Sequence, residues 1–274
     1  MTIPVDPVAF TIGSVEIRWY GIFIALAIVW IVIWLVWQMK KGANLTYDTV
    51  FTAALVGIPS GVIISRLLHV IDNIVVAKLH PEIVAAGQVF DYTQDPIKIL
   101  SFGEGLTAYG AVLGATLGIW IYFRIAKIAP GYFSHIIAPA IISAQAIGRI
   151  GCTLNGCCYG TACALPWAIE YPGTGLVHPT QVYEIIYNLI VFGVLWKLMG
   201  KVRPDGTLFM MYLALYSAYR VGMDFLRPGN DFLFGLHQAQ VIGIIVLAIT
   251  IPLLIRRWPW FEKEEIPQQE LEVS

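Results

Sequence analysis

Charged side chains inside long apolar segments are the residues of this sequence best suited to chemistry. Arg220 and Asp224 stand four residues apart in one such segment, and Gln145 and Arg149 repeat the spacing in another. Residues four apart lie on the same face of a helix. A charge at membrane depth costs roughly 2.5–3.5 kcal/mol, so such residues usually face a cavity and pair with each other. The alternative is a purely structural ion pair between Arg220 and Asp224.

A cavity lined by arginines suits an anionic lipid headgroup. The guanidinium group is planar and binds phosphate oxygens through paired hydrogen bonds, so phosphatidylglycerol is a candidate ligand. Arg66 ends another apolar segment and is expected to contact the same ligand. The glycine-rich stretch from Gly148 to Gly160 would let the backbone approach it closely. The simpler alternatives are that Arg66 and Arg18 extend to the membrane surface, and that the glycines only aid helix packing.

A cluster of cysteines is the second chemical feature. Cys152, Cys157, Cys158 and Cys163 are the four cysteines of the chain. One or two disulfides, reduced packing cysteines, and a redox or metal site are all compatible with this clustering. Because the run lacks the paired C-x-x-C of zinc motifs, and no histidine stands close to it, we expect no metal and no cofactor. His237 shows no ligand spacing and is assigned no role.

The elements that position these residues are membrane-spanning helices. The chain of 274 residues is 58% hydrophobic and only 13% charged, whereas roughly a quarter of the residues in soluble domains carry charge. A helix needs about 20 mostly apolar residues to cross the hydrocarbon, which predicts an all-α polytopic membrane protein of about seven helices. We place the spans at residues 17–38, 49–72, 105–124, 132–150, 181–199, 206–226 and 237–256.

The same chain is expected to form a single transmembrane domain over residues 1–261. No basic leader or cleavage site accompanies the first span, so we expect it to stay in the mature protein. A polar cytoplasmic tail over residues 262–274 should be disordered. The net charge of −1 indicates no nucleic-acid partner.

Loop charge predicts the orientation, because lysine and arginine accumulate at cytoplasmic helix ends. Basic residues follow the first, third, fifth and seventh spans, whereas residues 151–180 contain none. We therefore predict an N-terminus outside and a C-terminus inside. In this orientation the ionisable set maps to the outer half of the membrane: Arg18, Arg66, His69, Arg149, His178, Glu184, Arg220 and Asp224.

Several short motifs resemble one family of membrane enzymes. Gly148-Arg149-Ile150-Gly151, followed by Asn155-Gly156 and Gly160, resembles the signature segment of prolipoprotein diacylglyceryl transferases. Further stretches are similar to the family in the expected order, at residues 7–13, 17–21, 178–184, 219–228 and 235–240. Together these matches are specific, although no single one is.

The resemblance implies transfer of the diacylglyceryl group from phosphatidylglycerol to the lipobox cysteine of a prolipoprotein. This is the first step of bacterial lipoprotein maturation, carried out by a multi-pass protein of the inner membrane with its outer loops in the periplasm. The partners implied are phosphatidylglycerol, the prolipoprotein signal peptide and membrane lipid. Arginines would hold the phosphate and offset the charge that grows on the leaving glycerol phosphate.

Individual residues take roles from the same resemblance. Arg149 matches the family's headgroup-binding arginine, and Arg220 its sixth-helix arginine. Tyr109 stands where well-studied members have a histidine, and a neutral tyrosine donates a hydrogen bond rather than accepting a proton. The expected catalytic residues are Arg149, Arg220, Tyr20, Tyr109 and Asp224. The expected substrate-binding residues are Arg149, Asn155, His178, Gln181, Glu184 and Arg66.

The chain also departs from the family pattern. Cys152 and Cys157 replace an asparagine and a glutamate of the best-known members, and Asp224 replaces a glutamate. Since the family histidine is missing, either that histidine is not the essential base or this protein works differently. Arginines that lower the pKa of the acceptor thiol would be enough in principle. The alternatives are a family member with another acceptor, an anion transporter, and a membrane thiol-redox protein. A transporter would favour repeated halves, and we see no internal repeat.

Overall fold

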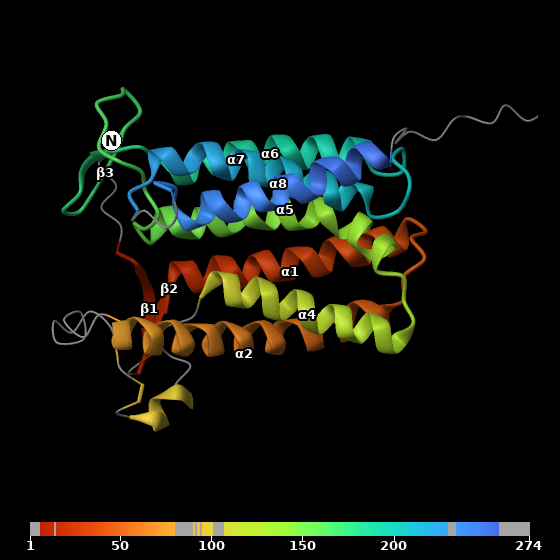
Figure 1. Ribbon diagram of the computed structural model, residues 1–274, viewed down its shortest axis with the longest axis horizontal. Coiled ribbons are helices and arrows are strands. Elements are labelled where there is room, and N and C mark those ends of the chain that lie inside the picture. The colour runs from red at the N-terminus through yellow and green to blue at the C-terminus, as the bar shows by residue number, and fades with distance from the viewer. Residues whose placement is uncertain are drawn as a thin grey trace, which may run out of the picture. The chain divides into compact units, whose positions relative to one another are not determined.

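The computed structural model describes residues 6–257, except for 14, 80–89, 91, 94, 101–106 and 230–233 (Figure 1). The chain divides into two compact units. One unit contains Met1–Gly42 and Gly131–Ser274, and the other contains Ala43–Pro130. The predicted tail over residues 262–274 lies outside the described residues.

Long helices make up most of the first unit. They are α1 (Trp19–Lys40), α5 (Pro130–Leu154), α6 (Thr180–Leu198), α7 (Thr207–Met223) and α8 (Gln238–Arg256). A buried apolar cluster joins α5, α6 and α7 through Ala138, Ile142, Val191, Leu195, Leu208 and Tyr212. Van der Waals packing among these side chains holds the helices together, because lipid tails are as apolar as leucine and supply no hydrophobic driving force between helices. This packing fixes the three helices that carry the charged residues.

Two tryptophans attach α1 to α5. Trp34 donates from Nε1 to the carbonyl of Ile136 at 3.0 Å, and Trp30 donates from Nε1 to Ser143 Oγ at 2.8 Å. Helix α1 also exposes a face with Leu26, Val29 and Ile33. An exposed apolar helix face is favourable in lipid, where polar backbone groups are satisfied inside the helix.

Each predicted span overlaps one helix of the described residues. Within the part of the chain that the structure describes, five helical stretches are long and apolar enough to cross a membrane, and Gly110–Ala126 is a shorter apolar helix. The five stretches are Trp19–Lys40, Tyr47–Val75, Pro130–Leu154, Thr180–Leu198 and Gln238–Arg256. The mostly helical fold is therefore that of a polytopic membrane protein, while seven spans and their orientation stay predictions.

Close helix packing defines the second unit. It contains α2 (Tyr47–Leu79), the 3-10 helix η1 (Pro96–Leu100) and α4 (Ala108–Ala126). Glycines recur every fourth residue on α4, at Gly110, Gly114 and Gly118. A Cβ atom on Gly110 would lie 2.5 Å from the Cα of Ser65, and one on Gly114 would meet the carbonyl oxygen of Ser60. Small residues let membrane helices approach this closely.

Two small β-hairpins depart from the all-α prediction. Strand β1 (Val8–Ile12) pairs antiparallel with β2 (Val15–Arg18), and β3 (Ile169–Tyr171) pairs antiparallel with β4 (Gly175–Val177). Both lie outside the helices, where the backbone needs other hydrogen-bond partners. Helix α1 consequently begins at Trp19 rather than at residue 17.

Candidate active site

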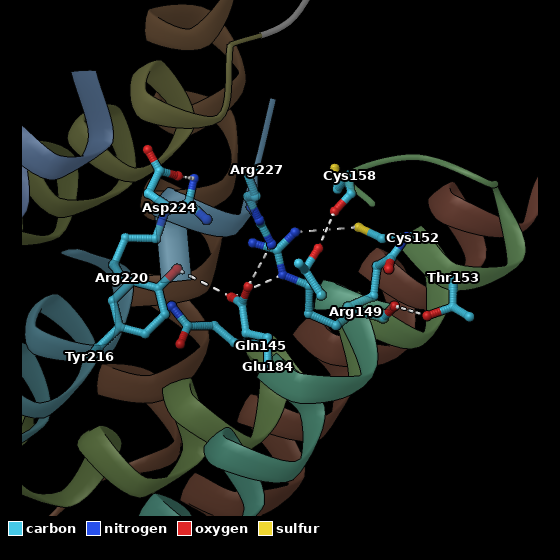
Figure 2. Close-up of polar contacts among 12 residues, drawn as sticks. Gln145, Arg149, Cys152, Thr153, Cys158, Glu184, Tyr216, Arg220, Asp224 and Arg227 are labelled. Carbon is cyan, nitrogen blue, oxygen red and sulfur yellow. Dashed lines mark hydrogen bonds and ion pairs between the residues drawn. The ribbon is translucent and has the colours of Figure 1, made fainter. Parts of the chain in front are cut away.

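Glu184 on α6 is the centre of a buried cluster of charged residues in the first unit. Its side chain is 1% exposed. Arg149 at the end of α5 donates from Nε to Glu184 Oε1 at 2.9 Å, and Arg227 donates from Nη2 to Oε2 at 3.0 Å. Figure 2 shows the two guanidinium groups converging on this carboxylate. One carboxylate thus holds two arginines from separate segments.

Two tyrosines of α7 contribute hydroxyl groups to the cluster. Tyr216 donates from its hydroxyl to Glu184 Oε1 at 3.4 Å (Figure 2). Gln145, one turn before Arg149, donates from Nε2 to the hydroxyl of Tyr212 at 3.0 Å. Gln145 and Arg149 therefore lie one turn apart on α5, as their spacing predicted. Their side chains bind different partners, because Gln145 contacts Tyr212 and Arg149 contacts Glu184.

A second ion pair lies where α7 ends. Arg220 Nη2 is 3.3 Å from Asp224 Oδ1, which confirms the pair predicted from the spacing of four residues. Asp224 opens the 3-10 helix η2 (Asp224–Leu226) and is 5% exposed. Its other oxygen, Oδ2, lies 3.0 Å from His237 Nδ1. The histidine that the sequence left without a role therefore orients this carboxylate.

The cluster has an excess of positive charge. Among its described residues, Arg149, Arg220 and Arg227 face only two carboxylates, those of Glu184 and Asp224. Burial lowers the pKa of Arg227, and the neighbouring guanidinium groups of Arg220 and Arg149 lower it further. Repulsion between like charges in a poorly solvated site is relieved by an anion.

Unpaired donors mark where an anion could bind. Arg220 Nη1, Arg227 Nε and the hydroxyl of Tyr219 are buried and have no hydrogen-bond partner among the described residues. A buried donor without a partner costs roughly 1–3 kcal/mol, and more when it is charged. Phosphate oxygens accept such bonds in pairs from guanidinium groups. The arrangement is suited to a phosphate group held by several arginines.

The loop after α5 is fixed to the start of α6. Gln181 donates from Nε2 to the carbonyl of Cys157 at 2.6 Å, and Thr180 donates from Oγ1 to the carbonyl of Cys158 at 2.7 Å. His178 accepts the backbone N–H of Gly160 at 2.8 Å through its carbonyl. A Cβ on Gly160 would lie 2.5 Å from the carbonyl oxygen of Leu226, so this glycine permits close backbone contact.

Two predicted substrate-binding residues make contacts within the protein. The side chain of Gln181 holds the loop backbone, and His178 Nδ1 lies 3.4 Å from the hydroxyl of Tyr183. Neither side chain is paired with the central carboxylate. Asn155 has a buried Oδ1 without a partner among the described residues, so it keeps a free acceptor.

All four cysteines are free thiols. The disulfides that were one sequence-based alternative are therefore not formed in this structure. Hydrogen bonds from Cys152 and Cys157 lower the pKa of Cys158 well below its usual value, with help from the Arg149 and Arg227 charges. Cys152 lowers the pKa of Cys157, but Cys158 and burial outweigh it, so that pKa is raised. The cluster favours one thiolate, at Cys158.

Tyr20 lies in the first turn of α1 and is 42% exposed. A Cβ atom on Gly151 would lie 3.3 Å from the Cα of Tyr20, so this turn packs against the last turns of α5. Arg18, by contrast, is 60% exposed and pairs with Glu16 at 3.6 Å. The structure thus brings Tyr20 to the end of α5 and leaves Arg18 at the surface.

Two predicted site residues belong to the second unit. Arg66 is 4% exposed and donates from Nε to the carbonyl of Ile99 at 3.1 Å, and its guanidinium lies over the ring of Tyr92. The guanidinium group of Arg66 is therefore held by the segment that contains Tyr92 and Ile99. Tyr109 lies in the first turn of α4. A role for either residue in the active site stays a prediction.

Sequence reasoning missed three members of the cluster. The sequence placed Arg227 only within a family-like motif and predicted no functional role for Tyr216 or His237. The available signal was Glu184 itself, because a carboxylate in an apolar helix needs basic partners. Its partner Arg227 lies 43 residues further along the chain, so no local spacing points to it.

Comparisons with known proteins agree on one family. A sequence model of prolipoprotein diacylglyceryl transferase matches residues 7–256. The chain is 46% identical over 268 residues to a phosphatidylglycerol–prolipoprotein diacylglyceryl transferase of Dehalococcoides mccartyi, covering 93% of this chain and 95% of that protein. Proteins of the same name from Symbiobacterium thermophilum and Corynebacterium efficiens are 33% and 31% identical, over 94% and 89% of this chain and 93% and 79% of their own lengths.

Proposed function

Since the chain belongs to the prolipoprotein diacylglyceryl transferase family, as its motifs predicted, we propose that its arginine cluster binds the phosphate of phosphatidylglycerol during transfer. The chain is a membrane transferase that acts in the first step of lipoprotein maturation. Its substrates are phosphatidylglycerol, which donates the diacylglyceryl group, and a prolipoprotein, which accepts it.

The reaction that we assign to this site is a displacement at carbon. The thiolate sulfur of the lipobox cysteine attacks the glyceryl carbon of phosphatidylglycerol, and a carbon–sulfur bond forms. The bond between that carbon and the phosphate oxygen breaks, and its electron pair leaves with glycerol phosphate. Fixed positive charge stabilises a leaving phosphate most where negative charge grows during the reaction.

Arg149, Arg220 and Arg227 supply that charge. Arg149 is 18% exposed and Arg220 is 20% exposed, so each can reach both the protein and a ligand. Arg227 is 10% exposed and keeps a buried Nε donor unpaired. Three fixed guanidinium groups can bind the phosphate without rearranging, which reduces the cost of reaching the transition state.

Glu184 and Asp224 act as positioning residues in this proposal. Glu184 orients Arg149 and Arg227, which would otherwise repel one another, and Asp224 orients Arg220. Asn155 would accept a hydrogen bond from the glycerol moiety through its unpaired Oδ1. Tyr20, exposed beside the end of α5, would donate to the substrate. A catalytic role for Tyr109 and a substrate-binding role for Arg66 are proposed from the family resemblance alone.

The acceptor thiol needs help to ionise, because an ordinary thiol with a pKa near 8.5 is only a few per cent thiolate at neutral pH. No histidine is available at the family position, which Tyr109 occupies. The excess positive charge of the cluster would lower the pKa of a thiol brought beside it. We place this chemistry at the periplasmic leaflet of the bacterial inner membrane, with seven spans, the N-terminus outside and the C-terminus inside.

Two observations support this proposal: the excess positive charge of the cluster around Glu184, and the buried hydrogen-bond donors there that have no partner among the described residues. The test uses purified protein, phosphatidylglycerol in detergent micelles and a lipobox peptide, with mass spectrometry of the peptide. We expect a diacylglyceryl adduct with the unmodified protein and none with Arg149→Ala. Arg203→Ala is the matched control, because Arg203 is 50% exposed and its ion pair with Asp205 lies at the surface. Full activity of Arg149→Ala would overturn the assignment.

A further inference from the structure

A group of three thiols lies next to the arginine cluster and is not used in the reaction above. Cys152 belongs to the last turn of α5 and is buried, Cys157 is half-buried, and Cys158 is exposed. Their sulfur atoms all lie within 4.8 Å of one another, and Cys157 and Cys158 are separated by 3.6 Å. Such a gathering of thiols from two short segments requires a specific backbone path.

We propose that Cys152, Cys157 and Cys158 form a thiolate site for one thiophilic d10 cation, with Zn²⁺ as the best fit. A tetrahedral zinc ion with three sulfur ligands at about 2.3 Å separates the sulfurs by roughly 3.8 Å. The thiols therefore need to close by no more than about an ångström around the ion. This departs from our sequence-based expectation of no metal, which relied on the missing C-x-x-C pair.

The backbone that carries these ligands is held before any ion arrives. The carbonyls of Cys157 and Cys158 accept hydrogen bonds from Gln181 and Thr180 at the start of α6. The backbone N–H of Cys157 donates to the carbonyl of Cys152 at 3.2 Å. Ligands fixed by surrounding hydrogen bonds bind a metal with a smaller entropic cost.

The local backbone adopts strained conformations of the kind that are common at functional sites. Cys158 has a φ of +66°, which is rare for a residue with a side chain, and Gly156 two residues earlier has a φ of +63°. A non-glycine residue in this region costs of the order of 1–3 kcal/mol and persists where the surroundings enforce it. Here the left-handed turn is what brings the sulfur of Cys158 back toward that of Cys152.

Charge also fits a cation bound by three thiolates. Three thiolates and one Zn²⁺ together carry a single negative charge, and Arg149 Nη1 lies 3.8 Å from Cys152 Sγ. The neighbouring guanidinium would offset that charge without competing for the metal, because it cannot act as a ligand. Three protein ligands leave one of the four tetrahedral positions open.

The test uses the full-length protein, purified under reducing conditions, stripped with a chelator and titrated with Co²⁺ and then Zn²⁺. We expect one Co²⁺ per chain, with the sulfur-to-cobalt absorption of thiolate ligands, and its displacement by Zn²⁺. X-ray absorption of the zinc-loaded protein should give three sulfurs at about 2.3 Å.

Single serine variants locate the ligands. Cys157→Ser and Cys158→Ser should lose stoichiometric binding, while Cys163→Ser should retain it, because Cys163 lies outside the thiol group. If a ligand variant fails to fold, the X-ray absorption spectrum of the unmodified protein still decides the question. Failure to bind Co²⁺ or Zn²⁺, oxygen-only coordination, or a disulfide among these cysteines in protein from its native membrane would overturn the proposal. The metal titration does not depend on transferase activity.

Discussion

Arg149 and Glu184 meet in the interior of the first unit, with Arg149 Nε 2.9 Å from Glu184 Oε1. The carboxylate is 1% exposed, and its second oxygen accepts a bond from Arg227 at 3.0 Å. A buried carboxylate shared in this way fixes two guanidinium groups at once and leaves the surrounding cluster positively charged. The consequences of changing it can be measured.

Glu184→Gln should reduce both stability and activity. The amide keeps the shape of the side chain but removes the negative charge that lies between Arg149 and Arg227 and offsets their repulsion. Removing one partner of a buried ion pair costs about 3–5 kcal/mol, which we expect to see as a lower thermal midpoint in detergent. Asp205→Asn is the control, because Asp205 is 41% exposed and such pairs contribute about 0–1 kcal/mol. Equal effects of the two changes would contradict a special role for Glu184.

Arg227→Gln should weaken the use of phosphatidylglycerol. A hydrogen bond to a charged group contributes about 1.5–3 kcal/mol, so we expect KM for the lipid to rise about tenfold or more. The measurement is the initial rate of peptide modification as the mole fraction of phosphatidylglycerol in mixed micelles is varied. An unchanged KM would remove Arg227 from the lipid site.

Cys158 should react with alkylating reagents at unusually low pH. Its pKa is lowered, so its thiolate exists above that depressed value and is lost only as the pH falls through it. The pKa of Cys157 is raised, so its thiolate forms only at more alkaline pH. Mass spectrometry after iodoacetamide treatment of metal-stripped protein at about pH 6 and pH 9 separates the two. Identical pH profiles for Cys158 in folded and denatured protein would contradict the expected shift.

Gly114→Leu should disrupt the second unit. A side chain at this position meets the backbone of Ser60, so α2 and α4 cannot keep their separation. Overpacking of this kind typically costs about 1–3 kcal/mol or more, visible as a lower thermal midpoint. Gly193→Ala is the matched control, because nothing lies within 4 Å of the added Cβ on α6. There the change should be neutral or stabilising, since alanine is the better helix former.

The sequence by itself determined the helices and one of the three arginine–carboxylate pairs of the cluster. About 20 apolar residues in a row give a span wherever the chain folds in lipid, and each predicted span overlaps a helix. Arg220 and Asp224 are one turn apart, so the helix alone brings them together. The motifs around Arg149 and elsewhere in the chain were sufficient to identify the family, because each motif is local in sequence and the motifs occur in a fixed order.

Only the tertiary structure decided the partners of Glu184 and the gathering of three cysteine thiols. Arg149, Glu184 and Arg227 lie on α5, on α6 and after η2, and their meeting depends on which helix faces pack together. Helical periodicity sets the face of each residue but not the neighbour of that face, which packing selects. Cys158 joins Cys152 because the chain turns through a left-handed conformation fixed by α6, and no spacing rule contains that turn.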